Sequence, residues 1–203
     1  MSNSFSVYGL KLPVISPGED IVEHILRAST RSGVGIEDKD IVVVTSKILS
    51  KAMGLLVNIE TIEPSKEAIK LAKKTGLEPR VVELIIRESD DIVFAIPFKK
   101  LVDEGVIDLS RMAYDLELGC KAVEYYPTIL VTIRDDMLWS DSGIDTSNHP
   151  RNIYSIPPRD LDRVAKELAL RIRKRTGKQV AVVICDTEFF IGGSIEVARG
   201  CTG

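Results

Sequence analysis

The sequence contains few cysteines, a single glutamine and no strong excess of either charge, and the shortages of cysteine and of charge each argue against a class of protein. The three cysteines lie far apart and form no C-x-x-C pair, which argues against a disulfide framework or zinc site and favours a reducing cytoplasm. The net charge of −3 gives no reason to expect a nucleic-acid partner, which calls for a basic face. No apolar run is long enough to span a bilayer, and the N-terminal MSNSFSVYGLKLPV lacks the pattern of a secretion signal.

What remains is an ordinary globular composition, with 44% hydrophobic and 28% charged residues. At 203 residues the chain is long enough to bury a substantial core, as one large domain or two small ones. Gln179 is its only glutamine, whereas Lys, Arg, Glu, Ile and Val are plentiful. This balance is typical of heat-adapted proteins.

Short apolar strands alternate with amphipathic helices along the chain. The β-branched runs IVVVT and VAVVIC are of the kind seen in buried strands. The strands are predicted at 41–45, 92–96, 128–133 and 180–185, and the helices at 19–30, from 65, at 80–87 and at 160–175. The pattern predicts an α/β or α+β fold of mixed sheets with flanking helices, and leaves open which of the two it is.

Residues 98–126 differ from the rest of the chain because they mix charged residues with isolated apolar ones. The pattern predicts one short helix there, from Leu109 to Leu118. We interpret this segment as an inserted subdomain or flap on a core formed by residues 1–97 and 127–203.

Two stretches carry side chains that suit a metal ion. The loop Ser140–Pro150 (SDSGIDTSNHP) offers oxygens from Asp141, Asp145 and Asn148, which suit Mg²⁺ or Mn²⁺ better than zinc. Asp186-Thr187-Glu188 follows the predicted strand 180–185, at the end where α/β proteins bind ligands. A solvated loop and a helix cap stay open as alternative interpretations, because the same residue types favour turns and helix caps.

Two lysines four residues apart follow the strand 41–45. Lys47 and Lys51 would share one face of a helix and could meet a polyphosphate as point charges. Two solvated lysines at the start of a helix are the alternative. An anion nearby would explain why cations occupy a helix start, where the dipole disfavours them.

With these motifs in place, the sequence resembles the coenzyme F-420: L-glutamate ligase family, the archaeal gamma-glutamyl ligases of the deazaflavin cofactor. The resemblance extends over most of the chain and preserves the order of its segments. The matching stretches are LPVISPGEDI from Leu12, VTSKILSKAMG from Val44, EPSKEAIKLA from Glu63, EPRVVELIIRES from Glu78, SGIDTSN from Ser142 and VAVVICDT from Val180.

The resemblance implies the ligase-family fold and a role for each matched residue. Asp145, Asp186 and Thr187 would hold Mg²⁺ or Mn²⁺, with Asp145 and Asp186 as the catalytic residues. The residues matched to GTP contacts are Leu12, Pro13, Val14, Ile15, Ser46, Lys47, Lys51 and Asn148. GTP would phosphorylate a carboxylate of the deazaflavin precursor, and the amine of L-glutamate would then displace phosphate. The resemblance also implies a homodimer.

Two alternatives stay open at this point. The stretch EFFIGGSIEVARG after Thr187 lacks the arginine-bearing loop of the family, and the segment 98–126 has no evident counterpart. Both features favour a related amide-forming ligase with another acceptor. The end of the sequence at Gly203 would suit a relative that binds nucleotide or deazaflavin without turnover.

Overall fold

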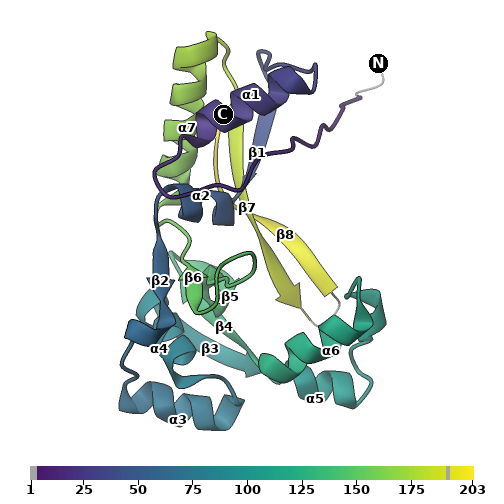
Figure 1. Cartoon of the computed structure of the whole chain (residues 1–203), viewed down its shortest axis with the longest axis vertical. Helices are drawn as coiled ribbons and strands as arrows, with labels where there is room; N and C mark the ends of the chain where they lie inside the picture. The colour runs from purple at the N-terminus through teal and green to yellow at the C-terminus, as the bar shows by residue number, and fades with distance from the viewer. Residues whose placement is uncertain (1–3, 191–192) are drawn as a thin grey trace. The chain divides into compact units, whose positions relative to one another are not determined.

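The computed structural model describes residues 4–190 and 193–203, which form an α+β protein. Its helices are α1 (Ile21–Arg31), α2 (Ser46–Ala52), α3 (Lys66–Thr75), α4 (Pro79–Glu88), α5 (Phe98–Asp103), α6 (Leu116–Tyr125) and α7 (Leu161–Thr176), with short 3-10 turns η1 (Ile59–Thr61), η2 (Leu109–Arg111) and η3 (Asp141–Gly143). Its strands are β1 (Ile41–Thr45), β2 (Leu56–Asn58), β3 (Asp91–Ile96), β4 (Ile129–Arg134), β5 (Met137–Ser140), β6 (Ile153–Ser155), β7 (Ala181–Phe190) and β8 (Gly193–Thr202). The prediction of mixed sheets with flanking helices is confirmed (Figure 1).

The chain divides into two compact units, and both draw on distant parts of the sequence. Unit 1 contains Met1–Leu55, Pro158–Cys185 and Ala198–Gly203, and unit 2 contains Leu56–Pro157 and Asp186–Val197. The segment 98–126 therefore lies within unit 2. Among the described residues, no helix is long and apolar enough to cross a membrane. No disulfide joins the three cysteines, all of which are described.

Unit 1 is built on a parallel pair of strands covered by helices on one face. β1 pairs with β7 from Ile41↔Ala181 to Thr45↔Cys185, and β7 lies between β1 and β8. Burial alternates along β1, so that Val42 and Val44 face the core while Ile41 and Val43 are 66% and 62% exposed. The prediction of a buried strand therefore holds for only one face of β1, because α1, α2 and α7 cover only one side of it.

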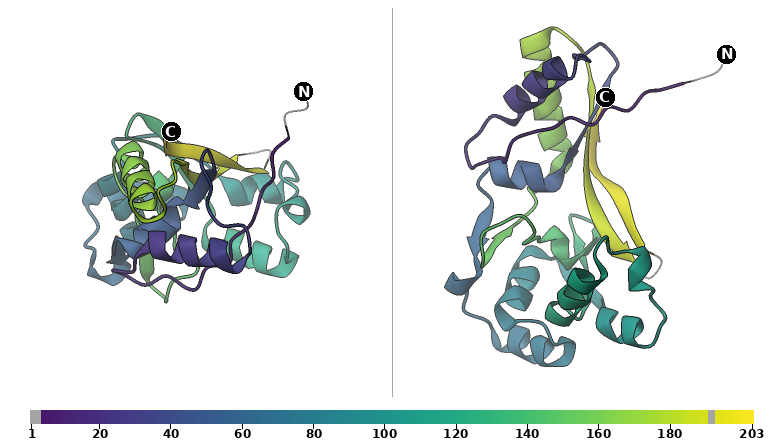
Figure 2. Two further views of the ribbon diagram at one scale, coloured as in Figure 1. Left: turned by 90° about the horizontal axis from the view of Figure 1, so that it is seen from above. Right: turned by 45° about the vertical axis from the view of Figure 1, so that its right-hand side comes forward.

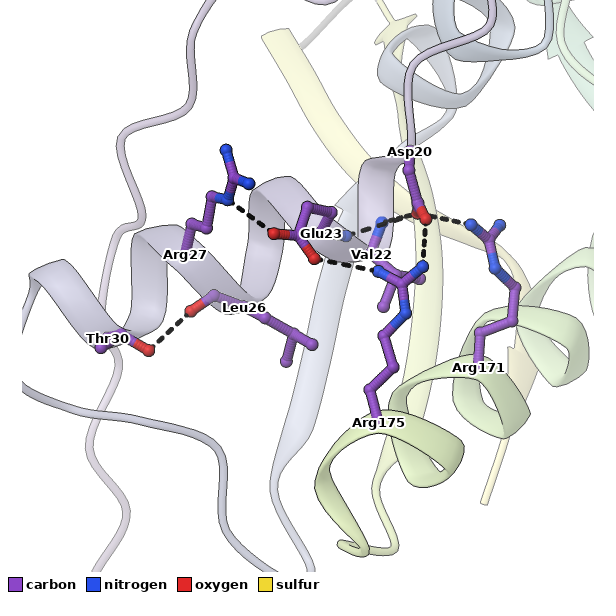
Figure 3. A network of polar contacts seen from close by, with 8 residues as sticks. All are labelled: Asp20, Val22, Glu23, Leu26, Arg27, Thr30, Arg171 and Arg175. Atoms are coloured by element: carbon purple, nitrogen blue, oxygen red, sulfur yellow. Dashed lines mark hydrogen bonds and ion pairs between the residues drawn. The ribbon is translucent and has the colours of Figure 1, made fainter.

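A network of charged groups joins α1 to α7, which lie side by side (Figure 2). Asp20 caps α1 by accepting hydrogen bonds from the backbone N–H groups of Val22 (3.0 Å) and Glu23 (3.4 Å), and it also accepts from Arg171 and Arg175 of α7 (Figure 3). Burial raises the pKa of Asp20, but the hydrogen bond from Arg175 and the two nearby guanidinium charges outweigh it and lower that pKa overall.

Unit 2 contains an antiparallel sheet in the order β3-β4-β5 and a two-stranded ribbon of β2 and β6. Helices α3 and α4 pack against each other beside a core that includes Leu130 of β4 and Tyr154 of β6 (Figure 1). The predicted start of α3 is confirmed, because the Ser65 side chain caps it by accepting from Ala68 N–H. Glu83 of α4 accepts from the Ser65 N–H at 2.8 Å, which joins the two helices.

The helix predicted from Leu109 to Leu118 is wrong in its bounds. Two aspartates divide the segment: Asp108 caps the short turn η2, and Asp115 starts α6 by accepting from Leu118 N–H at 3.0 Å. Such caps compete locally with a continuous helix. The segment packs on β3 and β4 through one apolar cluster, formed by Ile96, Phe98, Ile107, Leu109, Val123, Ile129 and Val131.

Candidate functional site

The position of Asp186 and Thr187 differs from the sequence prediction. The strand expected to stop at Cys185 runs on to Phe190, so both residues lie inside β7 rather than beyond its end. Three polar residues in a row suggested the end of the strand. The alternation of exposed and buried side chains nevertheless continues through them, because Thr187 is exposed and Glu188 is buried. The loop expected after Thr187 is strand wherever it is described, and residues 191 and 192 lie outside the described part.

The oxygens of this pair are held by neighbouring groups of unit 2. Asp186 is half-buried, and its Oδ1 accepts a hydrogen bond from Thr187 N–H at 2.9 Å. The Thr187 hydroxyl donates to Glu196 Oε1 on β8. The two predicted metal ligands therefore stand in a strand whose backbone is fixed by its neighbour, and Glu196 is a further carboxylate beside them that the sequence analysis missed.

The loop Ser140–Pro150 begins with a left-handed turn. Asp141, Ser142 and Gly143 have φ values of 49°, 55° and 72°, a conformation that costs energy for every residue except glycine. At Gly143 there is also no space for a side chain, because a Cβ would lie 2.6 Å from both Pro157 Cγ and Trp139 Cζ3. The packing of Trp139 and Pro157 against Gly143 therefore fixes the backbone conformation at the start of the loop.

Asp145 is held by backbone and side-chain hydrogen bonds. Its N–H donates to the Ser155 carbonyl at 3.1 Å, and the Ser155 N–H donates back to the Asp145 carbonyl at 2.8 Å. Its carboxylate accepts from the Ser147 N–H at 2.5 Å and from the Ser147 hydroxyl at 3.2 Å. Asp145 is half-buried, while Asn148 is exposed and has a left-handed backbone with φ 59°. The structure thus fixes the Asp145 carboxylate at the edge of β6.

Asp141 belongs to the fold rather than to the expected row of metal-binding oxygens. Its Oδ1 accepts from the Leu130 N–H at 2.8 Å, and its carboxylate also accepts from the Tyr126 hydroxyl. Burial raises the pKa of Asp141 to about 7; those two hydrogen bonds oppose the rise, and the negative charge of Glu188 adds to it. The expectation that Asp141 shares in a cation site with Asp145 and Asn148 is not supported by these inward contacts.

Glu188 connects β7 to the same loop. It is 2% exposed and accepts hydrogen bonds from both the N–H and the hydroxyl of Ser140, the latter at 2.6 Å. Glu188 lies two residues after Asp186, and Ser140 lies five before Asp145, so this contact joins the two strips of chain that carry the predicted metal ligands. The sequence analysis missed this contact, because the predicted strand ended at Cys185 and Glu188 faces the core only in the longer strand, where its buried carboxylate needs a partner.

The predicted nucleotide contacts lie in unit 1, except Asn148, which lies in unit 2. Ser46 starts α2 directly after β1 and is 2% exposed, and Lys47 and Lys51 are half-buried on the same short helix. In the stretch Leu12–Ile15, Val14 is 84% exposed and Ile15 is buried. This stretch leads to Gly18, whose N–H donates to the Ala52 carbonyl at the end of α2 at 2.8 Å. The structure thus connects these two groups of residues within one unit.

The donor set fits a hard divalent cation by its chemistry. Asp145, Asp186 and Thr187 all lie in unit 2 and offer only oxygen. Within residues 4–190 and 193–203, no group of three or more His, Cys, Asp or Glu side chains is arranged to hold a metal ion. A site of two carboxylates is usual for Mg²⁺, which keeps several waters and completes its shell with substrate phosphates.

Fold and donor set together define only a class, an α+β protein with oxygen donors suited to a metal–phosphate ligand. Comparison with known proteins makes the assignment specific. The sequence model described as F420-0:Gamma-glutamyl ligase matches residues 9–203. This chain belongs to that family.

Three relatives illustrate the similarity, and each is named Coenzyme F420:L-glutamate ligase. The protein of Methanopyrus kandleri is 32% identical over 93% of this chain and 62% of its own length. The proteins of Methanothermobacter thermautotrophicus and Methanocaldococcus jannaschii are 30% and 33% identical, over 95% and 97% of this chain and 66% of their own lengths. The chain thus spans less than two thirds of the length of these relatives.

Proposed function

We propose that this chain belongs to an enzyme that joins L-glutamate to a deazaflavin precursor of coenzyme F420, using GTP and Mg²⁺ or Mn²⁺. The observation that carries the proposal is the family match over residues 9–203, which includes every predicted site residue. The names of the relatives support the ligase reaction. GTP, the divalent cation and a homodimeric assembly in the cytoplasm come from the resemblance and the residue chemistry.

The reaction needs no protein nucleophile. GTP transfers its γ-phosphoryl group to the acceptor carboxylate, which gives GDP and an acyl phosphate. The amine of L-glutamate attacks the acyl carbon and releases phosphate, so that an amide bond forms. The bound cation would offset charge on the transferring phosphoryl group.

The chain's own residues supply binding and charge. Asp145, Asp186 and Thr187 provide the oxygen donors, and their hydrogen bonds to Ser147, to the backbone and to Glu196 orient those oxygens before any ligand arrives. Lys47 and Lys51, four residues apart on α2, provide positive charge for the polyphosphate. Ser46, Asn148 and the stretch Leu12–Ile15 provide further polar and backbone groups.

The decisive experiment supplies the purified protein with GTP, L-glutamate, Mn²⁺ and the deazaflavin precursor. We expect GDP release that depends on both acceptor and glutamate, and a product heavier by one glutamyl group in mass spectrometry. Asp145→Ala and Asp186→Ala should abolish turnover, whereas the matched control Asp136→Ala, at the exposed β4–β5 turn, should not. Absence of GDP and of product with every deazaflavin acceptor would refute the proposal.

Binding without turnover would point to a different role. If calorimetry detected GTP or deazaflavin binding but no amide formed, the chain would act as a binding relative. If GDP were released only with another carboxylate acceptor, the reaction class would stand and the acceptor would be wrong.

A further inference from the structure

One buried arginine holds both ends of the loop that carries Asp145 and Asn148. This segment, residues 143–156, follows the buried Ser142, includes strand β6 and ends before Pro157; it is called loop 143–156 below. The guanidinium of Arg134 donates through Nη2 to the Pro157 carbonyl at 2.6 Å and, more weakly, through Nη1 to the Ser142 carbonyl at 3.4 Å. A single side chain therefore contacts the residues on either side of this 14-residue segment.

Arg134 is itself fixed from several sides. It ends β4, is 1% exposed, and lies over the Trp139 ring with its guanidinium carbon 5.8 Å from the ring centre. The Trp139 Nε1–H donates to the Arg134 carbonyl at 3.1 Å, and Glu88 of α4 lies 3.4 Å from Nη2. A buried charge without such partners would be strongly unfavourable.

The geometry requires the fork of arginine rather than a positive charge alone. The two carbonyls are reached from different nitrogens of one rigid planar group, whereas a lysine ammonium is a single point with a flexible stem. The same ring that stacks on the guanidinium also fills the space beside Gly143, where Trp139 and Pro157 leave no room for a Cβ. Arg134, Trp139 and Pro157 thus form one block under the start of the loop.

We propose that Arg134 is a positioning residue that fixes the conformation of loop 143–156 and through it the place of the Asp145 carboxylate. The claim that Asp145 binds a metal ion rests on the function proposed above. The claim that Arg134 fixes the loop does not. A purely structural arginine would lower the stability of unit 2 as a whole. A positioning arginine changes the loop in molecules that remain fully folded.

The test compares Arg134→Met and Arg134→Lys with Leu109→Ala. Leu109 is 8% exposed in the apolar cluster under α5 and α6, which contains no residue of the loop, so its truncation lowers stability without touching the loop. Hydrogen exchange of the peptide 143–156 is measured in the metal-free protein, under conditions where circular dichroism shows each variant to be folded. We expect exchange to be about tenfold or more faster in Arg134→Met, intermediate in Arg134→Lys, and unchanged in Leu109→Ala.

Binding of Mn²⁺ alone, followed by electron paramagnetic resonance, gives the second measurement. In the folded protein we expect Arg134→Met to weaken Mn²⁺ binding by about tenfold to a hundredfold, as for other groups that orient metal ligands, and Leu109→Ala to leave it unchanged. Loop exchange at the wild-type rate in Arg134→Met, or equal acceleration in Leu109→Ala, would overturn the positioning role. If wild-type protein bound no Mn²⁺ while loop exchange responded as expected, the metal assignment would fail and the role of Arg134 in the loop would be supported.

Discussion

The carboxyl of Asp141, which is half-buried and bonded inward, should make unit 2 less stable at neutral pH than in mild acid. Burial raises its pKa from 3.8 to about 7, so the folded state binds a proton more tightly than the unfolded state does. The stabilisation from this proton is complete below about pH 4 and is lost as the pH rises through 7. The perturbation we propose is Asp141→Asn, which keeps the shape and removes the titration.

The magnitude follows from the difference of about three pH units between the folded and ordinary pKa values. At about 1.4 kcal/mol per unit, the charged form costs about 4 kcal/mol of folding free energy above pH 7. An asparagine oxygen can still accept from the Leu130 N–H, but the bond from Tyr126 weakens, at a cost of about 1 kcal/mol. Asp141→Asn should therefore gain about 3 kcal/mol at pH 8 and lose about 1 kcal/mol at pH 4.

Urea unfolding monitored by tryptophan fluorescence measures this effect where it occurs. Trp139 is the only tryptophan of the chain, is 1% exposed, and lies in unit 2 near Asp141. The free energy of unfolding of the wild type should fall steadily between pH 5 and pH 7, and that of Asp141→Asn should not. The control Asp136→Asn changes an exposed carboxyl in the turn between β4 and β5 and should retain the wild-type slope.

Two results would refute this reasoning. One is a wild-type stability that is flat between pH 5 and pH 7, which would mean that the folded and unfolded states bind the Asp141 proton equally. The other is the same slope in Asp141→Asn as in the wild type, which would assign the titration to another group. Either result would mean that the inward contacts of Asp141 do not set its titration apart from that of an exposed carboxyl.

Three further predictions follow from single contacts. The pKa of Glu83 is lowered to about 2, chiefly by hydrogen bonds from Ser65; Glu83→Gln should therefore cost about 3 kcal/mol at pH 7 in urea unfolding, a difference that disappears as the pH falls from about 4.5 to 2. Gly143→Ala should lower the free energy of unfolding by about 3 kcal/mol, from the clash with Trp139 and the left-handed backbone, and an unchanged urea midpoint would contradict the packing. Lys51→Ala should weaken GTP binding by about 1–3 kcal/mol in calorimetry; an unchanged affinity would make Lys51 an ordinary surface residue.

The sequence predicted those elements whose limits are set by nearby residues. Helices α1, α3 and α7 begin where Asp20, Ser65 and Asp160 cap them, and each cap acts within three residues of the helix start. The helix expected at 109–118 was wrong for the same local reason, because the capping role of Asp115 was not recognised. The capping residues that set the helix ends can thus be found in the sequence, even where the prediction missed one of them.

The end of β7 could not be predicted in this way. Asp186-Thr187-Glu188 looks like the polar end of a strand because three hydrophilic residues follow an apolar run. The strand continues because Thr187 is bonded to Glu196 nine residues on, and Glu188 is bonded to Ser140, 48 residues away. Partners at such separations fix the strand, and no pattern within the strand itself contains them.

In the loop Ser140–Pro150, too, the sequence alone could not separate the roles of two residues. Composition marked Asp141 and Asp145 as equal sources of oxygen, because they are the same residue four positions apart. The left-handed turn between them separates their roles: Asp141 bonds inward to Leu130 and acquires a raised pKa, while Asp145 is held at the edge of β6 by Ser155. That turn exists because Arg134 and the packing around Gly143 hold it. Buried residues outside the loop therefore separate the surroundings of Asp141 from those of Asp145, and for that reason we expect Arg134 to matter for the loop more than most of the loop's own side chains.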